Sequence, residues 1–292
     1  MKLKILIPTY KRPASLRGLL EELEKQIHTL EVFSDVIIHV FNNTQNEDIN
    51  KLYEEVFASF STRVLLKATT NGGNLGMVGN WNECLKCNYV QSDFIWVLND
   101  DDLPQSNALD LIFQGMRDFP NKSLVFWSRE VSIENVEFTP QWTKLRKQYF
   151  AWCINPRLKS SDFLMDYPFQ SISSFVFCSE HIYSKTFNAD FYPSFDYHFA
   201  SLLLPSIDHI VISEFLMKIK MGQNESLKPG VRENMIKVRK SVRAVMFENQ
   251  EVGMLMRMII WAADKTDSSN SYLISFLRNM IKLVLLVTTR RD

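Results

Sequence analysis

Short apolar runs alternate with longer amphipathic segments along the first half of the chain. Four apolar-rich runs are typical of buried strands, namely residues 4–8, 36–41, 63–66 and 94–98. The segments between these runs carry apolar residues at helical spacing, and the first of them is Leu16, Leu19, Leu20, Leu23 and Ile27. Strands that alternate with helices through short turns predict an α/β fold, with a mostly parallel sheet flanked by helices.

The second half of the chain is less regular. Strands are predicted near residues 124–127, 171–177 and 207–219, whereas residues 128–160 show poor periodicity and are predicted to be an irregular insertion. A polar loop at residues 223–230 contains Pro229 and Gly230, and two long helices are predicted beyond it, over 231–263 and 271–288. We therefore expect a main domain over 1–225 and a C-terminal helical extension over 226–292.

Composition narrows the class of protein. The 292 residues are 46% hydrophobic, which is enough for a sizeable core, and 33 basic residues balance 33 acidic ones. This balance gives no global field that argues for or against nucleic acid, and we expect no nucleic-acid partner. The chain shows no signal peptide and no run of 18 or more apolar residues, so we expect a cytoplasmic protein.

Polar side chains follow three of the predicted strands, at Thr9–Arg12, Asn42–Thr44 and Asn99–Asp102. In parallel sheets ligands bind outside the carboxyl ends of the strands, so these segments are expected to converge. Three adjacent carboxylates, Asp100, Asp101 and Asp102, repel one another unless a cation neutralises them, and Mg²⁺ or Mn²⁺ prefers such oxygen ligands. The alternative is an acidic turn in which Asp102 caps a helix starting near Pro104.

Three segments in register resemble family 2 glycosyltransferases. They are Ile5–Arg12, the Asn74–Asn80 loop and Trp96–Asp102, and the resemblance covers about the first 115 residues and weakens towards residue 215. It implies a GT-A fold with a Rossmann-like sheet, a divalent metal on a DxD-type motif and a nucleoside diphosphate sugar donor. Residues 1–115 would then be the nucleotide-sugar half and residues 116–225 the acceptor half.

The resemblance also implies roles for residues around the donor. The loop of Pro8, Thr9, Tyr10 and Arg12 would wrap the base and ribose. The loop of Asn74, Gly76 and Asn80 would shape the nucleotide pocket. In the family an aspartate that contacts uracil usually stands at the position of Asn42, and a UDP-sugar is therefore the expected donor. Because this chain has an amide there, other bases stay open. An Asx turn is the equal alternative for Asn42.

Asn99 shifts the register of the acidic motif. We expect Asn99 and Asp100 to contact the nucleotide, Asp101 to be the direct metal ligand and Asp102 to assist through water. In the alternative register, Asp100 and Asp102 form the DxD pair.

An inverting transfer needs a general base near the acceptor hydroxyl, and the resemblance places an acidic residue with this role at the start of a late helix, where this chain has Asp196. The alternative for Asp196 is a helix N-cap, and Asp190 is the reserve base. Ser173, Ser174 and His198 are the candidates for acceptor binding.

The sequence therefore predicts a metal-dependent, inverting hexosyltransferase that extends a surface polysaccharide, O-antigen or lipooligosaccharide. The alternatives are a non-catalytic nucleotide- or sugar-binding protein and a nucleotidyltransferase on a similar sheet. The apolar faces of the C-terminal helices are predicted to pack on the core or to form a homodimer, with contact to the inner face of the cytoplasmic membrane as the alternative.

Overall fold

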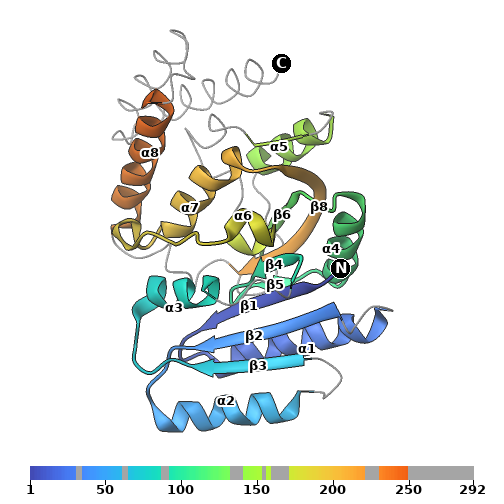
Figure 1. Cartoon of the computed structure of the whole chain (residues 1–292), viewed down its shortest axis with the longest axis vertical. Coiled ribbons are helices and arrows are strands. Elements are labelled where there is room, and N and C mark those ends of the chain that lie inside the picture. The colour runs from blue at the N-terminus through green and yellow to red at the C-terminus, as the bar shows by residue number, and fades with distance from the viewer. Residues whose placement is uncertain are drawn as a thin grey trace.

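One mixed sheet organises the structure (Figure 1), which is a computed structural model that describes residues 1–30, 35–60, 65–86, 92–131, 141–152, 156–158, 171–220 and 230–248. The sheet order is β3-β2-β1-β4-β7-β6-β8-β5. Its strands are β1 (Leu3–Thr9), β2 (Val36–Asn42), β3 (Leu65–Thr70), β4 (Phe94–Val97), β5 (Leu103–Pro104), β6 (Ser123–Val131), β7 (Phe175–Cys178) and β8 (His209–Lys220).

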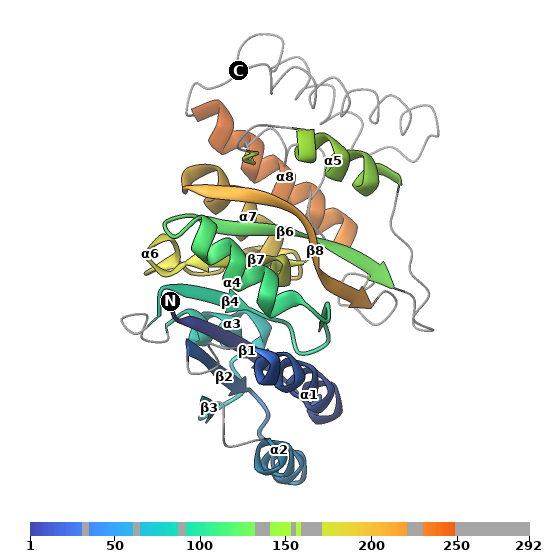
Figure 2. The same cartoon turned by 90° about the vertical axis from the view of Figure 1, so that its right-hand side faces the viewer.

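Helices cover both faces of this sheet. They are α1 (Pro13–Thr29), α2 (Glu47–Ser59), α3 (Gly76–Leu85), α4 (Ala108–Asp118), α5 (Gln141–Trp152), α6 (Ser179–Ile182), α7 (Phe195–Leu203) and α8 (Val231–Glu248). Figures 1 and 2 show α1 and α4 on one side of the sheet and α3 and α7 on the other, with α8 beyond α7. None of the described helices is long and apolar enough to cross a membrane.

The strands that carry the polar ends run parallel. The β1–β2 pair, the β2–β3 pair and the β1–β4 pair are all parallel, and the register places Thr9 beside Asn42 and Leu6 beside Val97. The strands β7 and β5 are antiparallel to their neighbours, while β6 and β8 pair in parallel. The predicted α/β fold class, with a mostly parallel sheet flanked by helices, is confirmed.

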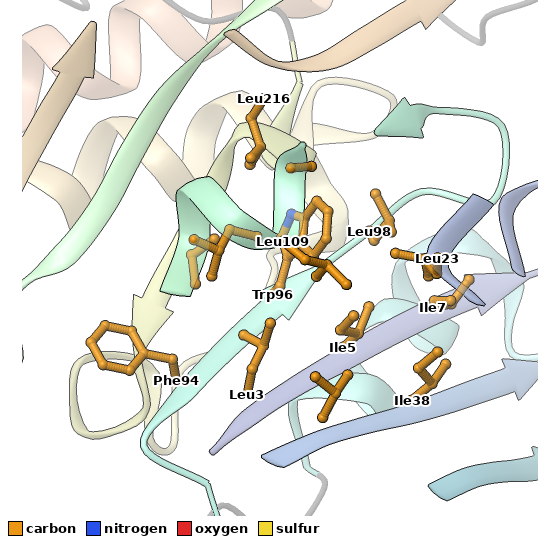
Figure 3. Close-up of a cluster of buried hydrophobic side chains, with 14 of the residues drawn as sticks. Leu3, Ile5, Ile7, Leu23, Ile38, Phe94, Trp96, Leu98, Leu109 and Leu216 are labelled. Atoms are coloured by element: carbon orange, nitrogen blue, oxygen red, sulfur yellow. The ribbon is translucent and has the colours of Figure 1, made fainter. Parts of the chain in front are cut away.

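Alternation along the central strands builds two hydrophobic cores. Leu3, Ile5 and Ile7 of β1 and Phe94 and Trp96 of β4 are fully buried against the face covered by α1 and α4 (Figure 3). Leu6 of β1 and Ile95 and Val97 of β4 pack on the opposite core, with Trp81 of α3 and the aromatic side chains of β7 and α7. Because β1 and β4 are buried on both faces, their sequences read as continuous apolar runs.

Three local predictions were wrong. The segment at 171–177 begins with a 3-10 turn, Ile172–Ser174, so that β7 starts only at Phe175. The region expected to be irregular contains the end of β6 and helix α5, whose apolar residues recur too weakly for the helical period to stand out. The helix expected near Pro104 starts at Ala108, because residues 103–104 pair with β8 as β5. The predicted helix at 271–288 lies outside the described residues.

Candidate active site

The polar ends of β1, β2 and β4 meet at one edge of the sheet, and a cavity of about 540 Å³ opens there. The backbone N–H of Asn43 donates to Thr9 O at 3.0 Å, and that of Leu98 donates to Leu6 O at 2.9 Å, so the strand ends are held side by side. The cavity wall comes from β1, α3, the segment after β4, the segment 192–197 and α8. Its lining includes Pro8, Thr9, Tyr10, Arg12, Asn43, Asn74, Gly76, Asn80, Asn99, Asp100, Asp101, Asp102, Ser171 and Asp196.

Asp100 is buried at the floor of this cavity. Its carboxylate accepts a hydrogen bond of 2.6 Å from Thr9 Oγ1 and one of 3.3 Å from Arg12 Nη1. Burial is the main cause that raises the pKa of Asp100 to about 6, and the neighbouring charge of Asp101 adds to it. The two donors therefore offset only part of the cost of burying this charge.

Asp101 is the most accessible of the three consecutive acids. Its side chain is 26% exposed and lines the cavity, and Arg12 Nη1 donates to Asp101 Oδ2 at 2.6 Å. The backbone of Arg12 is fixed independently, since its N–H donates to Tyr53 Oη at 2.9 Å. Sequence reasoning missed Tyr53, whose apolar spacing on α2 indicated only a core residue.

Asp102 has a different set of hydrogen-bond donors from Asp100 and Asp101. Its Oδ2 accepts hydrogen bonds from Ser171 Oγ and Ser173 Oγ at 2.7 Å and from Asn99 Nδ2 at 3.0 Å. Burial, and next the charge of Asp101, raise its pKa above the usual carboxyl range. The residue before α4 is Asn107, so Asp102 does not cap that helix.

The carboxylates at the end of β4 suit a divalent cation that takes its remaining ligands from substrate phosphates. In the ranges that the structure describes, no group of three or more His, Cys, Asp or Glu side chains converges on one point. Asp101 nevertheless presents a hard oxygen ligand to the cavity, and Asp100 lines the cavity beside it. Mg²⁺ is often held by one or two carboxylates plus substrate phosphates, which suits this geometry.

A network of asparagine side chains joins the strand ends to α3. Asn80 Nδ2 donates to Thr9 O at 3.3 Å and to Phe41 O at 3.1 Å, while its Oδ1 accepts from Asn71 Nδ2 at 2.9 Å. Asn43 Oδ1 accepts from Asn71 Nδ2 at 3.0 Å and so extends the network. Asn71 is a contributor that sequence reasoning missed, although its place in an Asn- and Gly-rich loop was a usable signal.

The loop before α3 depends on one glycine. Gly76 has φ +69°, a conformation that residues with a side chain rarely adopt. Its N–H donates to Asn74 Oδ1, and its carbonyl oxygen accepts from Asn43 Nδ2 at 3.1 Å. Asn74 and Gly76 therefore lie on the cavity wall, where the sequence placed them.

Asn42 does not line the cavity. Its Oδ1 accepts from the Thr44 N–H at 2.9 Å, which forms the Asx turn that was one of the two alternatives, and its Nδ2 donates to Asn50 Oδ1 at 2.7 Å. The neighbouring Asn43 reaches the cavity instead.

Asp196 lies on the cavity wall in the first turn of α7. The N-cap position belongs to Ser194, so the structure does not show the alternative in which Asp196 is itself the cap. Asp196 Oδ1 accepts from the Tyr197 N–H at 2.8 Å, and burial raises the pKa of Asp196 to about 6.

The three acceptor-binding candidates lie off the cavity wall. Ser173 is fully buried and hydrogen-bonded to Asp102, and the hydroxyl of the fully buried Ser174 bonds the hydroxyl of Ser128. The His198 ring stacks on Phe191 with centroids 3.7 Å apart, and burial lowers its pKa to about 4. The side chains of Ser173, Ser174 and His198 therefore bond or stack with neighbours inside the protein and do not line the cavity.

Helix α8 is part of the site, which the sequence did not indicate. Val231 and Met235 line the cavity, and Asn234 Nδ2 donates to Phe191 O at 2.9 Å and also contacts Tyr192 O. Lys237 Nζ donates to Asp190 O at 2.7 Å. The helix thus holds the segment that leads to Asp196, while the side chain of Asp190, the reserve base, does not line the cavity.

Comparisons with known proteins agree with this architecture. Residues 4–187 match the model of glycosyl transferase family 2. No curated protein matches the chain in sequence. The structure of S. aureus TarS 1-349 in complex with UDP-GlcNAc is similar, with a TM-score of 0.66 and 16% identity over 91% of this chain and 72% of that one.

A mannosyltransferase, PcManGT from Pyrobaculum calidifontis, in complex with GDP-Man and Mn²⁺, has a TM-score of 0.55 and 10% identity over 99% of this chain and 86% of that one. At such identities these two likenesses show the fold. The family model spans more than half of the chain and includes β1, the acidic segment and β7. The chain therefore belongs to glycosyl transferase family 2 and is a glycosyltransferase.

Proposed function

We propose that the protein transfers a sugar from a nucleoside diphosphate sugar to a hydroxyl group of a glycan, with inversion and with a divalent cation at Asp101. The observation that carries the proposal is that one cavity holds both the acidic end of β4 and the isolated carboxylate of Asp196. The family and the nucleotide sugars bound to TarS and PcManGT support this type of donor.

The acidic segment is proposed to hold the donor diphosphate. A cation bound at Asp101 would neutralise the charge that develops on the leaving diphosphate. Thr9 and Arg12 hold the neighbouring Asp100 in place through their hydrogen bonds. The loop of Pro8, Thr9 and Tyr10 lines the same end of the cavity and is proposed to contact the nucleoside.

Asp196 is proposed to accept the proton of the acceptor hydroxyl. Among the described residues that line the cavity, it is the acidic side chain that lies outside the segment 100–102. A single base separated from the diphosphate anchor suits a one-step displacement with inversion. With a pKa of about 6 the carboxylate is ionised at neutral pH, and it is a stronger base than an exposed aspartate.

The proposed acceptor is a surface polysaccharide, O-antigen or lipooligosaccharide chain, and the proposed cation is Mn²⁺ or Mg²⁺. Residues 226–292 are proposed as a C-terminal helical extension that packs on the core or on a second copy, with contact to the membrane face as the alternative. Helix α8, which lies within it, lines the cavity.

A donor panel tests the proposal. Purified protein is incubated with UDP-, GDP-, CDP- and dTDP-sugars in the presence of Mn²⁺ or EDTA, and release of the nucleoside diphosphate is measured. We expect release from one nucleotide class, dependent on Mn²⁺ and lost in Asp101→Ala. Asp196→Ala should bind the donor and lose transfer. Metal-dependent binding without turnover for any donor would support a non-catalytic binding protein instead.

A further inference from the structure

The guanidinium of Arg12 bridges the two carboxylates that face the cavity. Its Nη1 atom is 2.6 Å from Asp101 Oδ2 and 3.3 Å from Asp100 Oδ1. A divalent cation at Asp101 would use the same oxygen atoms. Two positive groups cannot share this position without strong repulsion, so the guanidinium and the ion are competitors for it.

The side chain of Arg12 can leave without disturbing the backbone. The N–H of Arg12 is held by Tyr53 Oη at 2.9 Å, and its carbonyl oxygen accepts from the Leu16 N–H at 3.1 Å in the first turn of α1. The side chain is 38% exposed and lines the cavity. A change of rotamer therefore moves the guanidinium off the carboxylates and leaves it beside any anion in the cavity.

We propose that Arg12 is an internal counter-ion that competes with the divalent cation for Asp100 and Asp101 and is displaced when the donor and the ion bind together. The freed guanidinium then pairs with the donor diphosphate, since planar guanidinium groups bind phosphate oxygens well. This inference rests on the proposed function, because it needs a metal at Asp101.

Competition of this kind couples the binding of the ion to the binding of the donor. An ion that binds alone must displace Arg12 into water, whereas an ion that arrives with a diphosphate gives the guanidinium a new anionic partner. Each ligand then raises the affinity for the other, and the coupling is reciprocal. Arg12 is in this sense a positioning residue that makes the site selective for the metal–diphosphate complex over the free ion.

The test measures Mn²⁺ binding directly, from the loss of the free-ion signal in electron paramagnetic resonance, with and without UDP. The variants are Arg12→Met and the matched control Arg17→Met, which removes the same charge from an exposed position of α1. Without UDP, we expect Arg12→Met to bind Mn²⁺ about tenfold tighter than the wild type, because both carboxylates lose their counter-ion. Arg17→Met should stay within about twofold of the wild type, because screening weakens distant exposed charges.

With UDP present, the gain in Mn²⁺ affinity should be large in the wild type and much smaller in Arg12→Met. Arg12→Lys keeps the charge but offers a single ammonium, so its gain in Mn²⁺ affinity should lie between those of the wild type and Arg12→Met. This variant preserves the test if Arg12→Met fails to fold. Unchanged or weaker Mn²⁺ binding in both Arg12 variants would overturn the competition while the metal site stands. If the wild type binds no Mn²⁺ even with UDP, the metal-dependent function and this inference both fall.

Discussion

Thr9 Oγ1 donates a hydrogen bond of 2.6 Å to Asp100 Oδ2, although the two residues are 91 positions apart in the chain. The same hydroxyl lies 2.8 Å from Tyr53 Oη, and Thr9 is only 2% exposed. The end of β1 is therefore tied both to the acidic segment and to α2. The arrangement of the candidate site depends on this buried hydroxyl as much as on the carboxylates.

Replacing Thr9 with valine keeps the shape of the side chain and removes its hydroxyl. We expect the free energy of unfolding to fall by about 1–3 kcal/mol, because Asp100 and Tyr53 each lose a buried partner. Donor turnover should fall as well. Urea denaturation and the donor assay measure both effects. The control is Thr69→Val, on the exposed strand β3, where the hydroxyl lies 2.8 Å from Nε2 of the partly exposed His39. Equal losses in the two variants would contradict the role of Thr9.

Asp196 gives a prediction for the pH dependence of stability. Its pKa is about 6 in the folded protein, above the 3.8 of an ordinary aspartate. Between pH 3.8 and about pH 6, Asp196 is protonated in the folded state and ionised in the unfolded state. Above pH 6 it is ionised in both states, and its buried charge then destabilises the fold. Asp196→Asn should raise the free energy of unfolding by about 1–2 kcal/mol at pH 7.5, allowing for partial solvent screening, with no gain at pH 3.5.

The same variant should lose transfer, because an amide cannot accept the proton. Wild-type activity should fall as the pH drops through about 6. Asp190→Asn is the control, since that side chain lies in the exposed 3-10 turn before α7. If Asp196→Asn is no more stable than the wild type at pH 7.5 and transfers normally, both the burial and the role of this carboxylate are wrong.

His198 is expected to be structural. Its ring is stacked on Phe191, and its pKa is lowered to about 4, so it is neutral throughout the range in which a base would act. His198→Phe keeps the stacking and should leave the pH profile and rate of donor turnover unchanged. A shift of the profile in this variant would contradict a purely structural role for His198.

Asn80→Asp tests the asparagine network. The change is nearly isosteric, but it points an acceptor at Thr9 O and Phe41 O, where the amide now donates. Because Asn80 is 3% exposed, we expect a loss of about 2–4 kcal/mol in the free energy of unfolding. Asn107→Asp, at the exposed N-cap of α4, should be neutral or stabilising. Equal stability of the two variants, measured by urea denaturation, would contradict the network.

The sheet and the convergence of polar strand ends could be predicted because they depend on local patterns. The apolar runs of β1 and β4 are buried on both faces, and parallel pairing then brings Thr9 and Asp100 to one edge. The prediction failed where orientation depends on long-range packing. Ser174 is held in the core by the hydroxyl of Ser128, 46 positions earlier, and His198 by the ring of Phe191. The spacing of apolar residues along the chain records neither contact.

The contribution of α8 could not be predicted for a similar reason. Its Val231 and Met235 look like ordinary apolar positions of an amphipathic helix, and only the docking of α8 beside the segment 190–194 brings them to the cavity. The pairing of Arg12 with Asp101 was likewise hidden. The sequence placed both residues at the site, but not the 2.6 Å contact between them.

Calorimetric titration of UDP into the wild type and Asp101→Asn, each with Mn²⁺ and with EDTA, tests the central claim most directly. A nucleoside diphosphate held by a metal at the acidic end of β4 predicts binding by the wild type with Mn²⁺, and little or none with EDTA or in the variant. Binding that is equal in Mn²⁺ and EDTA, or unaffected by Asp101→Asn, would contradict the account.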